Sequence, residues 1–106
     1  MNAFDSTLSL CMRARRLTFG LDTVRNTAAR GEVFLLLTAS DLSPKTVKEV
    51  EYLSSRYHIP CCKIARCMEE VANIIGKKTG VIGITDEGFS NKLMLIHNET
   101  EDHLCR

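Results

Sequence analysis

A five-residue stretch bounded by glycines, "GKKTG" at residues 76–80, carries the side chains best suited to polar chemistry in this 106-residue chain. Two lysine ammonium groups and one threonine hydroxyl could bind phosphate, the lysines by charge and the hydroxyl by hydrogen bonding. The same residues would also keep a surface turn solvated. The stretch by itself therefore leaves two interpretations open, a phosphate-binding loop and a solvated turn.

The elements around this stretch exclude one kind of phosphate site. A P-loop follows a strand, and its Lys and Ser or Thr open a helix. Here an apparent helix precedes the stretch and the apolar run "VIGI" follows it, so helix amides would not face a bound phosphate. We therefore exclude a nucleoside-triphosphatase. A nucleic-acid backbone remains as a partner, since each lysine–phosphate contact releases counterions.

No set of side chains indicates catalysis. The three histidines lie at an expected helix end and near the C-terminus. The adjacent acid pairs Glu69–Glu70 and Asp86–Glu87 stand where helices begin, and carboxylates there interact favourably with the helix dipole. We expect no enzymatic activity and no cofactor.

The five cysteines are an odd number and lack the paired spacing of zinc sites. Reduced thiols in the core or near the surface fit them better than metal ligands or disulfides. The sequence therefore predicts no metal site and agrees with a cytoplasmic protein.

Composition is that of one ordinary globular domain, with 44% hydrophobic and 25% charged residues. No apolar run approaches the roughly 18 residues of a membrane span, and the N-terminus lacks a secretory pattern. The formal net charge is only +1, but the first 30 residues hold five arginines against two aspartates. That basic N-terminal segment could bind a polyanion, or it could be a solvated helix face.

Helix and strand signals alternate along the chain. Ser43 is a good N-cap and Pro44 a good first helical residue, while Gly31 is well placed to end a helix. The unbroken apolar run 33–39 is typical of a strand buried on both faces. This pattern predicts a three-layer α/β/α sandwich with a central mixed sheet of about four strands. Expected helices are 5–16 (capped by Asp5 or Ser6), 21–30, one within 41–60, 67–75 and 86–96; expected strands are 17–19, 33–39, 61–65 and 80–84.

Several segments in order resemble the ribosomal protein L7Ae family, particularly its small bacterial stand-alone members. They are "LSLCMRARRLTFGLDTV", "FLLLTASDLSPKT", "YHIPCCKI" and "EEVANIIGKKTGVIGITDEGFSNKL". The resemblance covers roughly Leu8 to Leu95. It implies one RNA-binding domain over residues 1–96, without a catalytic centre or cofactor, that is ribosome-associated or binds a kink-turn-like structured RNA. After His97 the composition turns polar and acidic, so we expect the tail, 97–106, to be disordered or a loose extension.

In that family RNA lies in a cleft formed by three segments, the start of the second helix, the turn after the buried strand, and the loop before the last strand. The resemblance implies that Lys77, Lys78 and Thr79 meet RNA phosphate or sugar. It implies further that Gly20 lets the RNA approach the backbone closely and that Val81 offers apolar surface to an unstacked base. The implied RNA-binding residues are Gly20, Leu21, Asp22, Thr23, Arg25, Asn26, Ser43, Val47, Lys77, Lys78, Thr79, Gly80 and Val81.

The chain departs from the family pattern at the second helix. Where strong kink-turn binders have Gly-x-Asn-Glu, this chain has Gly20-Leu21-Asp22-Thr23. An ionised Asp22 can only accept hydrogen bonds and repels phosphate. Asn26 and Met68 stand at positions where the family has lysine. Two functions therefore stay open: RNA binding, and a protein-interaction module that keeps the fold but has lost kink-turn recognition.

Overall fold

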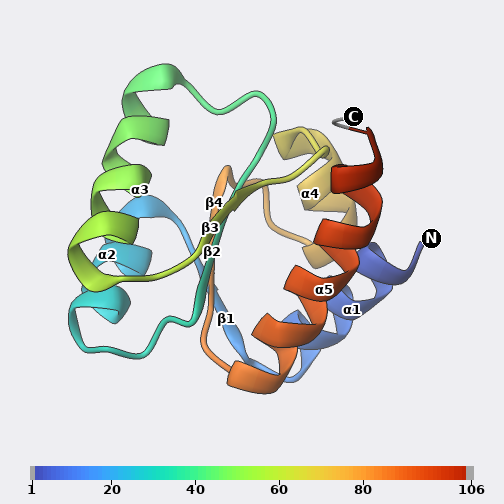
Figure 1. Ribbon diagram of the computed structural model, residues 1–106, viewed down its shortest axis with the longest axis horizontal. Coiled ribbons are helices and arrows are strands. Elements are labelled where there is room, and N and C mark those ends of the chain that lie inside the picture. Colours follow the sequence, from blue (N-terminus) through green and yellow to red (C-terminus); the bar gives the residue numbers. More distant parts are fainter. Residues whose placement is uncertain (1, 105–106) are drawn as a thin grey trace.

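A computed structural model of the protein describes residues 2–104, with side chains described up to residue 99. Within this part of the chain, helices and strands alternate around one sheet (Figure 1). The elements are α1 (Ala3–Arg13), β1 (Leu17–Phe19), α2 (Leu21–Ala29), β2 (Leu35–Thr38), α3 (Pro44–Tyr57), β3 (Cys61–Lys63), α4 (Met68–Ile75), β4 (Val81–Ile84) and α5 (Glu87–Leu104).

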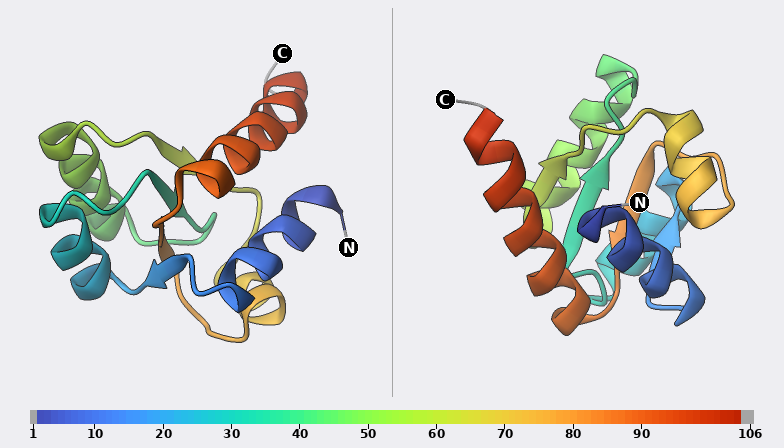
Figure 2. Two further views of the ribbon diagram at one scale, coloured as in Figure 1. Left: turned by 90° about the horizontal axis from the view of Figure 1, so that it is seen from below. Right: turned by 90° about the vertical axis from the view of Figure 1, so that its right-hand side faces the viewer.

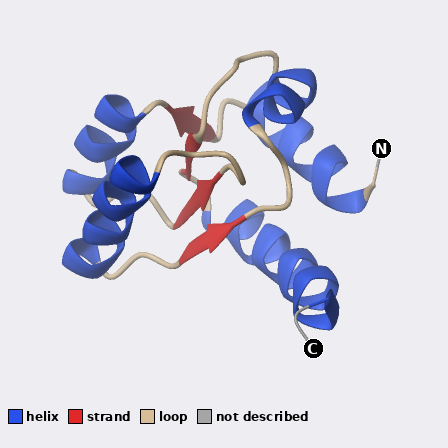
Figure 3. Cartoon of the chain, turned by 90° about the horizontal axis from the view of Figure 1, so that it is seen from above, coloured by secondary structure: helices blue, strands red, loops and turns tan. Residues whose placement is uncertain are grey.

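The sheet has the strand order β1-β4-β2-β3. β4 runs antiparallel to both β1 and β2, and β2 runs parallel to β3. Helices α2 and α3 cover one face, and α1, α4 and α5 cover the other, as the views from other sides also show (Figures 2 and 3). The predicted three-layer α/β/α sandwich with a mixed four-stranded sheet is therefore confirmed.

The position of the central strand β2 between two helical layers explains why three of its four residues are leucines. Leu35 and Leu37 pack in the core cluster beneath α1, α4 and α5, whereas Leu36 packs in the cluster beneath α2 and α3. Successive side chains of a strand point to opposite faces. Because helices cover both faces, every position of β2 is buried, the three leucines and Thr38 alike.

Helix boundaries follow local capping chemistry. Ser43 caps α3 as predicted, its Oγ accepting from Thr46 N at 3.3 Å. The first helix starts earlier than predicted, because the side chain of Asn2, rather than Asp5 or Ser6, accepts a hydrogen bond from Asp5 N at 2.9 Å. Gly31 follows α2 with a φ of +75°, as expected for a residue that ends a helix.

At the C-terminus α5 continues to Leu104, where the sequence predicts a loose extension after His97. That prediction is wrong up to Leu104, because the residues after His97 continue the helix; residues 105–106 lie outside the described part. None of the helices in residues 2–104 has the length and apolar character that a bilayer span requires.

Candidate functional site

The sheet topology brings three loops to one edge. β1 and β2 both end where β4 begins, because β4 is antiparallel to each of them. The residues that follow β1 and β2 therefore lie beside the residues that precede β4. These are the start of α2, the turn before α3 and the loop 76–80, which are the three segments that the resemblance implies.

Backbone hydrogen bonds join these segments directly. Gly20 N donates to Val81 O at 3.0 Å, and Ala39 N donates to Gly80 O at 2.9 Å. A Cβ added to Gly80 would lie 2.4 Å from Leu42 Cδ1 and 3.2 Å from Met68 Sδ. Glycine at position 80 thus lets Leu42 pack directly on the loop. We call this edge, formed by residues 20–26, 40–47 and 76–81, the three-loop edge.

Gly20 is required by its own backbone conformation. Its φ of +87° with ψ of 139° is a combination that residues with a Cβ rarely adopt. This conformation turns the chain from β1 directly into α2, whose first helical hydrogen bond runs from Val24 N to Gly20 O at 2.9 Å.

We expect Gly20→Ala to lower the free energy of unfolding by about 1–3 kcal/mol, since the strained φ and ψ must be kept or the turn must distort. A Cβ there meets no atom within 4 Å, so the cost comes from the backbone alone. Urea unfolding would measure it, with exposed Thr23→Ala as the control, which should stay within about 0.5 kcal/mol of the parent. Equal stability of the Gly20→Ala variant and the parent would contradict this explanation.

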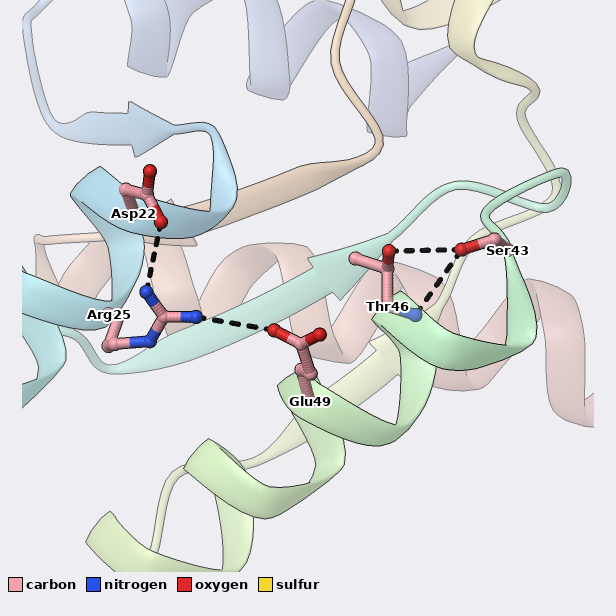
Figure 4. Close-up of polar contacts among 5 residues, drawn as sticks. All are labelled: Asp22, Arg25, Ser43, Thr46 and Glu49. Atoms are coloured by element: carbon pink, nitrogen blue, oxygen red, sulfur yellow. Dashed lines mark hydrogen bonds and ion pairs between the residues drawn. The ribbon is translucent and has the colours of Figure 1, made fainter.

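The exposed face of α2 carries a charge network (Figure 4). Arg25 Nη1 lies 2.9 Å from Asp22 Oδ1, and Arg25 Nη2 lies 3.2 Å from Glu49 Oε2 on α3. The Asp22 side chain is 91% exposed, so its second oxygen faces solvent at the edge. Arg25, one of the predicted RNA-binding residues, therefore already forms ion pairs with two carboxylates. Thr23 and Asn26 are also exposed on α2, and Leu21 is half-buried.

At the start of α3, Ser43 is committed to the helix. Its Oγ both accepts from Thr46 N and donates to Thr46 Oγ1 at 3.0 Å (Figure 4). Val47, one turn further on, is half-buried. Ser43 thus has a structural role, and Val47 keeps part of its surface at the edge.

The two lysines of the loop 76–80 differ in their surroundings. Lys78 Nζ lies 2.9 Å from Glu69 Oε1 on α4, and this hydrogen bond raises the pKa of Lys78. Lys77 is exposed and has no carboxylate within 4.0 Å in the described part of the chain. Lys77 therefore offers an ammonium group without competition, whereas Lys78 must leave Glu69 to bind another anion.

The remaining predicted residues of this loop are buried. Thr79 is 8% exposed, and its hydroxyl donates to Val81 O at 3.1 Å and accepts from Val81 N at 3.3 Å. Val81 is 3% exposed and Gly80 is also buried. The predictions that Thr79 presents its hydroxyl to RNA and that Val81 offers surface to a base are therefore wrong in this structure. Val81 lies in β4 and packs in the core cluster beneath α2 and α3, against which Leu42 also packs.

The structure adds residues that the sequence analysis did not place at the site. Leu42 and Met68 are half-buried beside Gly80, and Asp41 Oδ1 accepts from Met68 N at 3.0 Å, which ties the β2–α3 turn to α4. Glu49 and Glu69 hold two of the basic groups. Glu49 lies five residues after Pro44, and helical periodicity alone does not tell which neighbouring helix its face meets.

Three of the described cysteines, Cys11, Cys61 and Cys62, are buried or half-buried free thiols. Burial raises the pKa of Cys11 to about 12 and that of Cys61 to about 11, and burial also raises the pKa of Cys62. These thiols stay protonated at neutral pH. In the described residues, no three His, Cys, Asp or Glu side chains gather in a way that could hold a metal ion.

The chain matches the sequence model of the ribosomal protein L7Ae/L30e/S12e/Gadd45 family over residues 2–94. It is 35% identical over 89 residues to the RNA-binding protein YlxQ of Enterococcus faecium, covering 80% of this chain and 82% of the relative. It is 32% identical over 92 residues to the RNA-binding protein YlxQ of Bacillus subtilis strain 168, covering 82% and 87%.

Two solved structures share the fold. A protein of unknown function from Bacillus halodurans C has a TM-score of 0.86 and 32% identity, covering 91% of this chain and 97% of that one. The 15.5kD RNA binding protein of Giardia lamblia has a TM-score of 0.74 at 16% identity, covering 92% and 84%. The Giardia likeness concerns the fold alone.

Proposed function

This chain belongs to the ribosomal protein L7Ae/L30e/S12e/Gadd45 family, and on that basis we propose that it is a small, non-catalytic RNA-binding protein that uses the three-loop edge. Its relatives in Enterococcus and Bacillus are both named RNA-binding proteins. The partner in this proposal is a structured RNA in the cytoplasm, either of kink-turn type or a segment of ribosomal RNA on the ribosome.

The observation that supports this proposal most is the junction of the three loops. The hydrogen bonds from Gly20 to Val81 and from Ala39 to Gly80 place Lys77, Arg25 and the half-buried Val47 on segments of one edge. Cations can position an RNA backbone, while partly exposed apolar side chains can contact an unstacked base. Val47, Leu42 and Leu21 take the apolar role in this proposal, in place of the buried Val81.

One observation favours the alternative, a protein-interaction module. Asp22, Glu49 and Glu69 neutralise much of the basic character of the edge. Such a balanced surface suits a protein partner better than a polyanion. RNA binding remains the better supported function, because Lys77 is not engaged within the described residues and both named relatives bind RNA.

The test is the affinity of the purified protein for a kink-turn RNA and for a plain duplex of equal length, measured across a salt series. Structured recognition predicts at least about tenfold tighter binding of the kink-turn at each salt concentration, since non-specific binding depends on phosphate charge alone. Equal, weak and steeply salt-dependent binding of both RNAs would contradict kink-turn recognition and would favour a different RNA or the protein-interaction module.

A further inference from the structure

A second polar surface continues from the three-loop edge along α3. Lys48, Tyr52 and Arg56 are spaced four residues apart, so they lie in one stripe about 12 Å long on the helix. This stripe and Arg25 of α2 line a groove of about 410 Å³, together with Glu49, Leu53 and Tyr57. α2 and α3 both begin at the three-loop edge (Figure 4). The groove, lined from both helices, therefore leads away from that edge.

The groove combines positive charge with an exposed aromatic ring. Arg25, Lys48 and Arg56 face it against one carboxylate, Glu49, which is bound to Arg25. Tyr52 is 63% exposed, the most exposed of the large hydrophobic side chains at the surface of the described residues. The Arg56 guanidinium carbon lies 5.6 Å from the centroid of the Tyr57 ring. This cation–π contact orients the guanidinium group of Arg56 beside the groove.

These features fit single-stranded nucleic acid better than an acidic peptide. Single strands bind where cations follow the backbone and aromatic rings stack on the bases. An acidic peptide would use mainly the cations, whereas a single strand uses the cations for its phosphates and the planar ring of Tyr52 for a base. Arg25 belongs to both surfaces, so a strand that leaves the three-loop edge could enter the groove without a break.

We propose that this groove binds the single-stranded RNA that flanks the structured element, with a base stacked on Tyr52 and phosphates bound by Lys48 and Arg56. The inference rests on the proposed function, because it assigns the flanking strand of the same RNA. It adds a second contact surface, on the middle and end of α3, outside the three-loop edge.

The experiment compares two RNAs that share one kink-turn, one blunt and one with a single-stranded extension of a few nucleotides at one end, tested in both polarities. The parent protein is expected to bind the extended RNA of one polarity more tightly. Tyr52→Ala should lose about tenfold in affinity for that RNA only, as expected for one stacked base. Tyr52→Phe, which keeps the ring, should bind as the parent does, and so should Arg13→Ala on α1, behind the sheet.

A second readout observes the ring directly. The chain has two tyrosines and no tryptophan, so fluorotyrosine labelling produces two fluorine signals, which Tyr52→Phe assigns. Stacking predicts that the Tyr52 signal shifts with the extended RNA and stays in place with the blunt RNA.

The outcomes separate the two proposals. If neither RNA binds the parent, the proposed function and this inference both fail. This inference alone fails if both RNAs bind the parent but the Tyr52→Ala variant still binds the extended RNA more tightly than the blunt RNA. It also fails alone if Tyr52→Ala lowers the affinity for both RNAs equally. A shift of the Tyr52 signal on addition of poly-glutamate, but not on addition of single-stranded RNA, would overturn this inference in favour of an acidic protein partner.

Discussion

The double variant Lys77→Ala, Lys78→Ala is expected to weaken kink-turn RNA binding by about tenfold or more near 0.15 M salt and to flatten its salt dependence. Each phosphate contact contributes roughly 0.7–0.9 to the slope of log affinity against log salt. The loss of two contacts should therefore lower the slope by about 1.5. Fluorescence anisotropy across a salt series would measure both quantities. Both side chains are exposed, so the fold should be retained.

The single variants should differ, because Glu69 holds Lys78 and no described carboxylate holds Lys77. Lys77→Ala should account for most of the lost affinity. The matched control is Arg13→Ala with Lys92→Ala, which removes the same charge from exposed positions on α1 and α5, outside the three-loop edge. An equal loss in the control would show that only net charge matters and would remove this loop from the site.

Neutralising the two carboxylates around Arg25 should act in the opposite direction. Asp22→Asn with Glu49→Gln is expected to raise RNA affinity by about tenfold, or roughly 1.4 kcal/mol. The change frees the guanidinium for phosphate and removes two negative charges that repel the RNA backbone. Exposed ion pairs contribute only about 0.2–1 kcal/mol each to stability. The variant should therefore stay folded, and its gain can be measured by the same binding assay.

A double-mutant cycle decides whether Arg25 mediates this gain. In an Arg25→Ala background, the carboxylate substitutions should increase affinity much less, since the group that they release is absent. An unchanged gain in that background would show that the carboxylates act through general repulsion. A lower affinity after neutralisation would instead favour a protein-interaction surface, on which Asp22 and Glu49 contact a partner directly.

Local signals were enough to predict the layers of this protein. The apolar run 33–39 requires cover on both faces, and Ser43 followed by Pro44 marks the start of α3 through capping geometry that depends only on neighbouring residues. The family was inferred from several segments that resemble it in the same order along the chain. The match over residues 2–94 confirms this inference. The lysines of the loop 76–80 were visible as exposed polar residues because both flanking glycines interrupt the apolar pattern.

The tertiary structure decided which residues of the candidate site are accessible. The strand order β1-β4-β2-β3 brings Gly20, Ala39 and Val81 together across long sequence separations. Packing beneath α2 and α3 buries the Val81 side chain, which we expected to offer surface to a base. The hydrophobic pattern of a strand predicts which of its faces are buried, but it does not predict which other strand pairs with it. In the same way, only the packing of α2 against α3 places Glu49 on Arg25. The sequence thus determined the fold and the basic loop, and contacts between distant elements determined the surface and its charge balance.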